Sequence, residues 1–223
     1  MKEQHPLNNP KSLRYKLRKK RSKFILELIQ HIVKNKNSKQ IKICDLGGTF
    51  RYWQVFPFEE FTSIEFQIDL INIEEKRFKD KVSLPNVVFN SMVGDGCDLS
   101  SISDNSYDLS HSNSVIEHVG NWQRVKAFAL ESKRIAEYYY IQTPNYWYPI
   151  EPHYMLPFVH MMPRPIHTRF LQVFKKLNFD RASANFDENR MLSRKEFKHL
   201  FKESKHHTEW LVLPKSFVAM SKL

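Results

Sequence analysis

Hydrophobic and polar residues follow two periodicities along this chain, and their alternation predicts a mixed α/β protein. Strand-like runs rich in β-branched or aromatic residues are IKICDLGG, FQIDLINIEE, PNVVFN, the start of SYDLSHSNSVIEHV, EYYYIQT, TEWLVLP and SFVAMSK. Helical spacing predicts helices over 12–34, around 121–136, around 168–178, and after Ser193, which forms a capping-box pattern with Glu196. The last two strands predict a hairpin around Pro214 and Lys215. Strands that alternate with helices and end in such a pair predict a mainly parallel sheet with one antiparallel element.

One long segment, 143–168, fits neither periodicity. It reads TPNYWYPIEPHYMLPFVHMMPRPIHT, and its six prolines exclude a regular helix or a central strand. Long irregular insertions in compact domains are usually functional. We therefore expect this insertion to shape a binding site.

Composition and charge narrow the possible functions. The chain has 223 residues, enough for one α/β domain, and its net charge of +11 comes entirely from residues 1–42, which hold 13 Lys or Arg and 2 acids. This predicts a basic N-terminal helical arm over 1–39 ahead of a single domain over 40–223. Residues 11–23 of the arm either contact an anionic surface, such as phosphates, lipid headgroups or acidic glycans, or are simply a solvated helix.

The cellular compartment and the membrane question follow from the same counts. No run of about 18 apolar residues predicts a transmembrane segment, and the N-terminus lacks the apolar core of a signal peptide. Two cysteines, Cys44 and Cys97, give no disulfide framework. Cytoplasmic localisation is the expectation. The scattered histidines lack metal-ligand spacing, so no metal is expected.

Glycine is scarce, and four of the five glycines lie in two loops that follow predicted strands. The turn Asp45-Leu46-Gly47-Gly48 has the form of a nucleoside cofactor site, where glycine lets the backbone approach a ligand at a strand end, although a plain tight turn has the same pattern. The sequence contains neither the G-x-x-x-x-G-K-[ST] of a P-loop nor the G-x-G-x-x-G of a dinucleotide fold.

Motifs in a fixed order add a family resemblance. IKICDLGGTFRYW resembles the first motif of class I S-adenosylmethionine-dependent methyltransferases, close to the type 11-like enzymes, and INIEE resembles the acidic end of their second strand. VGDGCDL resembles their adenine loop, and SYDLSHSNSVIEHVGNW their fourth strand with its Glu-His-Val signature. The likeness runs from about residue 40 to 142, and the last helix and strand pair extend it to the C-terminus. It implies a Rossmann-like fold with a seven-stranded, mainly parallel sheet, an antiparallel C-terminal strand, and helices on both faces.

The resemblance also implies a cofactor site. Asp45, Gly47 and Gly48 would contact the amino-acid end of S-adenosylmethionine, Glu74 the ribose, Asp95 and Gly96 the adenine, and Asn113 and Ser114 the methionine side. S-adenosylhomocysteine would be the product. Thr49 and Arg51 stand where the family has further glycines, and the long gap from Asp45 to Glu74 makes Asp69 a rival for the ribose contact.

The insertion is the expected acceptor wall, and its NYWYPIEPHYMLPFVHMMP run resembles a segment of type 11-like enzymes thought to act on glycans or lipid-linked metabolites. Tyr146, Trp147, Tyr154 and His160 are the expected substrate contacts. His153 is the first candidate for a general base, with His118 and Glu151 as further candidates, and a structural role is the alternative for both histidines.

Three functions follow. The leading one is O-methylation of a small-molecule, glycan or lipid-linked acceptor. The second is nucleic-acid methylation with the basic arm on phosphates, which the missing [DNS]-P-P-[YF] signature at Asn113-Ser114 makes less favoured. The third is a non-catalytic binding protein on the same fold, against which the acids at Asp45, Glu74 and Asp95 argue.

Overall fold

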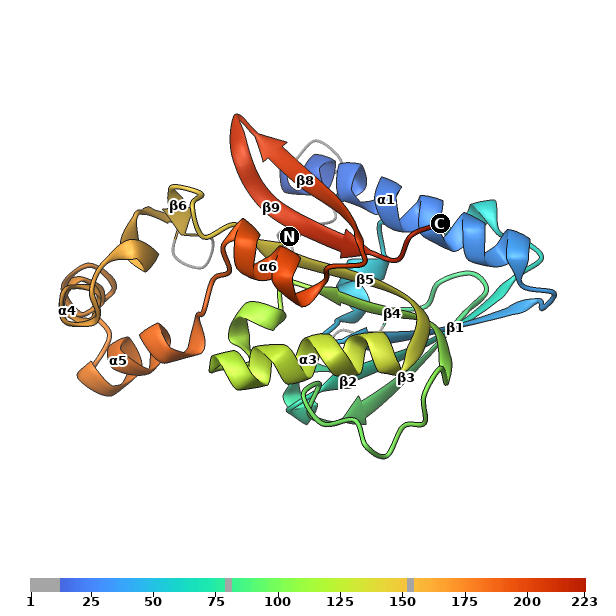
Figure 1. Ribbon diagram of the computed structural model, residues 1–223, viewed down its shortest axis with the longest axis horizontal. Coiled ribbons are helices and arrows are strands. Elements are labelled where there is room, and N and C mark those ends of the chain that lie inside the picture. Colours follow the sequence, from blue (N-terminus) through green and yellow to red (C-terminus); the bar gives the residue numbers. More distant parts are fainter. Residues whose placement is uncertain (1–12, 79–81, 152–154) are drawn as a thin grey trace, which may run out of the picture.

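A twisted seven-stranded sheet with helices on both faces forms the body of the protein (Figure 1). The computed structural model describes residues 13–78, 82–151 and 155–223, with side chains from Ser22 onward. The sheet strands are β1 (Gln40–Leu46), β2 (Glu65–Asn72), β3 (Val87–Val93), β4 (Tyr107–Asn113), β5 (Ala136–Pro144), β8 (Lys205–Leu211) and β9 (Leu213–Met220). The helices are α1 (Leu13–Asn35), α2 (Phe50–Trp53), α3 (Trp122–Arg134), α4 (Arg164–Lys175), α5 (Phe179–Glu188) and α6 (Arg194–Leu200). Short strands β6 (Ile150–Glu151) and β7 (Leu156–Pro157) pair apart from the sheet.

The strand order is β3-β2-β1-β4-β5-β9-β8, with β1 to β5 parallel and β9 antiparallel to both of its neighbours. This confirms the predicted sheet and its reversed strand. From β1 the chain adds β2 and β3 on one side and then β4 and β5 on the other, so the direction of the connections reverses between β1 and β4. In open α/β sheets, ligands bind outside the carboxyl ends of the strands at such a switch point.

Each face of the sheet carries its own apolar layer. The C-terminal half of α1 covers one face with Ile25, Leu28 and Ile29, all fully buried. Helices α3 and α6 cover the other, where Phe128 and Phe197 are buried. The division of the chain after residue 39 stays a prediction, but the second half of α1 is packed into the same core as the sheet.

The helix predicted around 168–178 is present as α4, but its bounds differ from the prediction. Helix α4 begins earlier, because Pro165 falls in its first turn, where a missing N–H breaks no helical hydrogen bond. It ends at Lys176, which adopts a left-handed conformation (φ 54°). A second helix, α5, then starts at an Asn178 cap whose side chain accepts from the Arg181 N–H.

Two other boundaries are clear from the backbone and its caps. The terminal hairpin turns at Val212 (φ 64°) instead of Pro214-Lys215, and Pro214 lies inside β9 with its carbonyl accepting from the Asn145 amide. The capping box of Ser193 and Glu196 is confirmed by both of its reciprocal hydrogen bonds. No helix in the described part of the chain is long and apolar enough to cross a membrane.

Candidate active site

Four loops meet along the carboxyl ends of neighbouring strands and are tied into one rim. The Gly47 N–H donates to the Ile71 carbonyl (2.7 Å), and the Asn72 side-chain amide donates to the Gly48 carbonyl (2.8 Å), so β2 holds the loop after β1. The Gly94 N–H donates to the Asn72 carbonyl (2.9 Å), which adds the loop after β3. Asn72, which the sequence patterns did not single out, is therefore the residue that joins three loops of the rim.

Asp45 lies beneath this rim, at the end of β1, with no exposed surface. One carboxylate oxygen accepts from the Trp53 indole N–H (2.8 Å), and the other lies 2.6 Å from Nδ1 of His111 on β4. The His111 ring packs among Tyr52, Trp53 and Tyr140. Asp45 thus joins strand β1 to a buried aromatic cluster through both of its carboxylate oxygens. The aromatic partners lie 8 and 66 residues away in sequence, too far apart for a local pattern to reveal them.

The glycine pair fits tightly against protein atoms. Gly47 has a positive φ of 71°, and a Cβ there would stand 2.5 Å from a Val115 methyl. A Cβ on Gly48 would lie 1.7 Å from the Asp45 carboxylate. Packing against Val115 and Asp45 therefore accounts for both glycines, whatever the loop binds.

The adenine-loop candidate Asp95 is held from α3. Both of its oxygens accept from Arg124 Nη2 (3.0 and 2.8 Å), and one also accepts from the Cys97 N–H (2.9 Å). Partial burial by itself would raise the pKa of Asp95, but the Arg124 and Cys97 hydrogen bonds outweigh it and lower that pKa. The side chain keeps 36% of its surface exposed, so an oxygen lone pair remains accessible. Gly96, next in the loop, packs against the Phe128 ring.

The two candidates for a ribose contact lie in different places. Asp69 is buried within β2 and accepts from Gln67, Asn90 and the Tyr107 hydroxyl (2.8 Å), so it belongs to the sheet interior and not to the rim. Glu74 lies two residues beyond the end of β2, with 45% of its side chain exposed, and pairs with Lys76 at 2.6 Å.

The loop after β4 closes the rim on the side of β1. Ser114 has a left-handed backbone (φ 56°), and both its N–H and its hydroxyl donate to Gln142 on β5 (3.0 and 2.9 Å). A non-glycine residue in this region is uncommon and marks a constrained turn. Asn113, the last residue of β4, is half-buried beside it.

The Glu-His-Val turn links the rim to the segment between β5 and α6, which contains the insertion 143–168 and helices α4 and α5. Glu117 is fully buried and accepts from the Thr143 hydroxyl (3.1 Å), and its carbonyl accepts from the Arg190 N–H (2.7 Å). Next to it, Nδ1 of His118 lies 3.3 Å from the Glu188 carbonyl at the end of α5. This turn therefore stands between the predicted cofactor side and the predicted acceptor side.

The insertion places its own polar residues in and around a small core. Glu151 is buried, while the Nε2–H of His160 donates to the Tyr146 carbonyl (2.7 Å), and the His160 ring packs edge-on to the Tyr146 ring. Trp147, by contrast, is exposed. The pKa of the buried His167 is lowered chiefly by burial, against an opposing effect of Glu151. His153 and Tyr154 lie outside the described residues.

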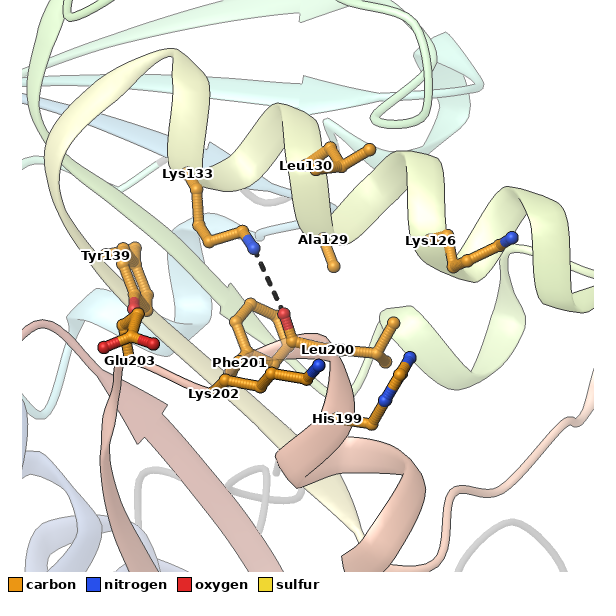
Figure 2. Close-up of a pocket in the computed structure, with 10 residues that line it drawn as sticks. All are labelled: Lys126, Ala129, Leu130, Lys133, Tyr139, His199, Leu200, Phe201, Lys202 and Glu203. Carbon is orange, nitrogen blue, oxygen red and sulfur yellow. Dashed lines mark hydrogen bonds between the residues drawn. The ribbon is translucent and has the colours of Figure 1, made fainter.

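A separate hollow of about 410 Å³ lies between α3 and α6 (Figure 2). Lys126 and Lys133 of α3 and Lys202 after α6 surround it, and Lys133 donates to the Leu200 carbonyl (3.1 Å). None of the predicted site residues lines this hollow, so it is distinct from the rim. Among the described residues, no three His, Cys, Asp or Glu side chains gather as metal ligands would.

No protein-family model and no curated protein sequence matches the chain. Among solved structures, the DszA carbon methyltransferase is similar with a TM-score of 0.57 and 13% identity, over 97% of this chain and 56% of that one. A magnesium protoporphyrin IX methyltransferase from Synechocystis PCC 6803, solved with bound S-adenosylhomocysteine, gives 0.50 and 12% over 90% and 82%. A S-adenosylmethionine-dependent methyltransferase from Archaeoglobus fulgidus gives 0.50 and 13% over 91% and 94%.

At such identities the likeness concerns the fold, and it agrees with the strand order and the reversed β9. The closer resemblance to type 11-like enzymes stays a prediction. The chain has the fold of the class I S-adenosylmethionine-dependent methyltransferases.

Proposed function

We propose that this protein is a S-adenosylmethionine-dependent methyltransferase that binds its cofactor across the carboxyl ends of β1 to β4. The observation that carries the proposal is the continuous rim of loops at the switch point of the sheet, tied together through Asn72. Likeness to solved methyltransferases, one with S-adenosylhomocysteine bound, supports the same reading.

The side chains along the rim fit the adenine, the ribose and the amino-acid end of the cofactor. Asp95 is charged at neutral pH and fixed by Arg124, so it is a preorganised acceptor for an adenine amino group. Glu74 has the exposure and the flexibility to take both ribose hydroxyls, in exchange for its contact with Lys76. Asp45 acts in this proposal by holding the turn from below, and the main chain of Gly47 and Gly48 faces the amino-acid end.

Methyl transfer needs alignment above all. When bound, S-adenosylmethionine would supply an activated methyl group on a positively charged sulfur to an acceptor held in line with the carbon–sulfur bond. The protein has to hold the acceptor in line and keep water out. The segment between β5 and α6 is joined to the rim through the Arg190 N–H and the Glu117 carbonyl. In this proposal it holds the acceptor and excludes water.

A hydroxyl acceptor must also lose its proton, which calls for a base. His118 is the described candidate that lies between the rim and the insertion, since it follows the β4 loop and reaches the end of α5. Glu151 is buried inside the insertion. We therefore propose His118 as the base for an oxygen acceptor on a small molecule, a glycan or a lipid-linked molecule.

Calorimetric titration with S-adenosylmethionine and S-adenosylhomocysteine tests the proposal. We expect a dissociation constant on the order of micromolar for both, a free energy near about −8 kcal/mol. Asp95→Ala should lose most of this binding, whereas Asp187→Ala, which removes an exposed carboxylate paired with Arg164 on the insertion, should keep it. Absence of heat with both ligands, for a protein that is folded by circular dichroism, would exclude the function.

A further inference from the structure

The segment between β5 and α6, which contains the insertion 143–168 and helices α4 and α5, exposes large apolar side chains that a surface facing only water seldom carries together. Trp147, Phe174 and Phe179 are 67%, 65% and 63% exposed, and Met155 and Phe158 are exposed as well. They belong to a part of the chain that projects from one end of the sheet (Figure 1). This surface needs a covering that is not supplied by the described part of the chain.

Helix α4 arranges its share of these residues in one strip. Ile166, Phe170, Val173 and Phe174 are spaced i, i+4, i+7 and i+8, which places them on one side of the helix, and the rings of Phe170 and Phe174 stack at 4.3 Å. The inward side of the helix carries His167, Thr168 and Leu171, which are buried. Phe170 is half-buried and packs at the edge of the small core around Leu171, whereas Ile166, Val173 and Phe174 are exposed, so the exposed strip adjoins the face that holds α4 in place.

Positive charge accompanies the strip. Residues 155–179 contain Arg164, Arg169, Lys175 and Lys176 and no Asp or Glu. Arg169 lies three residues after Ile166 and four before Val173 in α4, so helical geometry puts it beside the apolar strip, while Lys175 and Lys176 stand at the C-terminal end of the helix. An apolar strip bordered by cations is the pattern of a helix that lies in the interface of an anionic bilayer.

The segment between β5 and α6 is also joined to the proposed active site. The Arg190 N–H bonds to the Glu117 carbonyl, and His118 reaches the Glu188 carbonyl, so the rim and the insertion are joined through the turn after β4. A surface on which the insertion rests is therefore close to the acceptor side of the proposed active site.

We propose that the exposed side of α4, with the loops beside it, docks on an anionic lipid bilayer and that the methyl acceptor is a lipid-borne molecule. The second part rests on the proposed methyltransferase function, and the docking does not. A second copy of the chain is the less suitable occupant, because a symmetric contact through this strip would bring like charges together.

Vesicle co-sedimentation tests the docking. The full chain is mixed with vesicles of phosphatidylcholine containing about one-third phosphatidylglycerol, and with pure phosphatidylcholine vesicles as the uncharged reference. The double variant Phe174→Ser/Phe179→Ser should bind the anionic vesicles about tenfold or more weakly, because burial of a Phe ring contributes more than a factor of ten. Leu130→Ser is the matched control, since Leu130 is equally exposed but lies on α3; it should bind as the natural chain does.

Trp147 provides a signal from the insertion itself. Lipids brominated in their acyl chains should quench its fluorescence, and the Trp147→Phe variant should lose most of that quenching although Trp210 is also exposed on β8. Binding should persist in part at about 0.5 M salt, where purely electrostatic attachment by the N-terminal arm is screened.

Three results would overturn the docking: no binding of the natural chain, equal binding of the double variant and the control, or light scattering that shows a dimer which the double variant dissociates. Calorimetry with S-adenosylmethionine on the same samples separates the two proposals. Vesicle binding without cofactor binding would support the docking and exclude the methyltransferase function. Cofactor binding without vesicle binding would support the methyltransferase function and exclude the docking.

Discussion

The buried carboxylate of Asp45 allows the most direct test of how the candidate site is built. In the fold it accepts hydrogen bonds from Trp53 (2.8 Å) and from the ring of His111 (2.6 Å), and none of its surface is exposed. Asp45→Ala removes the acceptor and leaves two buried donors in place. If Asp45 supports the aromatic cluster, Asp45→Ala should lower the free energy of unfolding. If Asp45 is a cofactor contact, the variant should bind the cofactor more weakly while its free energy of unfolding is retained.

The magnitude follows from the two contacts. A buried donor left without a partner costs about 1–3 kcal/mol, and more when the lost acceptor carried a charge, so we expect Asp45→Ala to lower the free energy of unfolding by about 3–6 kcal/mol. A domain has about 5–15 kcal/mol in total, so the variant should be marginally folded. Asp45→Asn keeps the volume and one acceptor oxygen, and should cost about 1–2 kcal/mol.

Urea unfolding followed by tryptophan fluorescence gives these values, because Trp53 lies in the perturbed cluster. The control is Asp187→Ala, whose carboxylate is exposed and pairs with Arg164; it should change stability by less than about 1 kcal/mol. An Asp45→Ala protein whose unfolding free energy stays within about 0.5 kcal/mol of the natural chain would refute the reasoning, and loss of cofactor binding in that stable protein would assign Asp45 to the ligand.

Three further predictions concern the rim, the base and pH. Asp95→Asn should weaken S-adenosylmethionine binding about tenfold in calorimetry, because it removes a charged acceptor, with Asp98→Asn as the control; equal affinities would remove Asp95 from the site. His118→Ala should lower kcat by about 10²–10⁴ and leave the cofactor dissociation constant unchanged, and an unchanged single-turnover rate would exclude it as the base. Burial lowers the pKa of His167, His206 and His207, so the unfolded chain takes up protons before the folded state as the pH falls. The free energy of unfolding should therefore decrease as the pH drops below about 6.5, as urea titrations at successive pH values can show, and a flat profile from neutral pH to about 5.5 would contradict it.

Much of the fold could be predicted from local patterns. Alternating β-branched runs placed the seven sheet strands, and the capping residues Ser193 and Glu196 placed the start of α6, because these signals depend on neighbours within a few residues. The sequence patterns also located the loops after β1 and β3, since glycine is scarce elsewhere in the chain.

Local sequence patterns did not reveal the boundaries that depend on the backbone conformation of a single residue. The left-handed residues Lys176 and Val212 fix the end of α4 and the turn of the terminal hairpin, and neither is a residue type that favours this conformation. Helix α5 was missed because it is short and is positioned by its packing on α4 around Val159, Leu171 and Ala182.

The burial and the partners of the candidate site residues were visible only in the tertiary structure. Asp45, Asp69 and Asp95 are all acids in or after neighbouring strands in the sequence. In the structure, Asp45 and Asp69 are buried against partners far along the chain. Asp95 remains accessible, and Arg124, which fixes it, comes from a helix 29 residues away. Sequence by itself determined the order of the elements and the edge of the sheet where the loops gather. Which carboxylates face a ligand depends on contacts between distant strands and helices, and burial of each charge in the folded chain decides it.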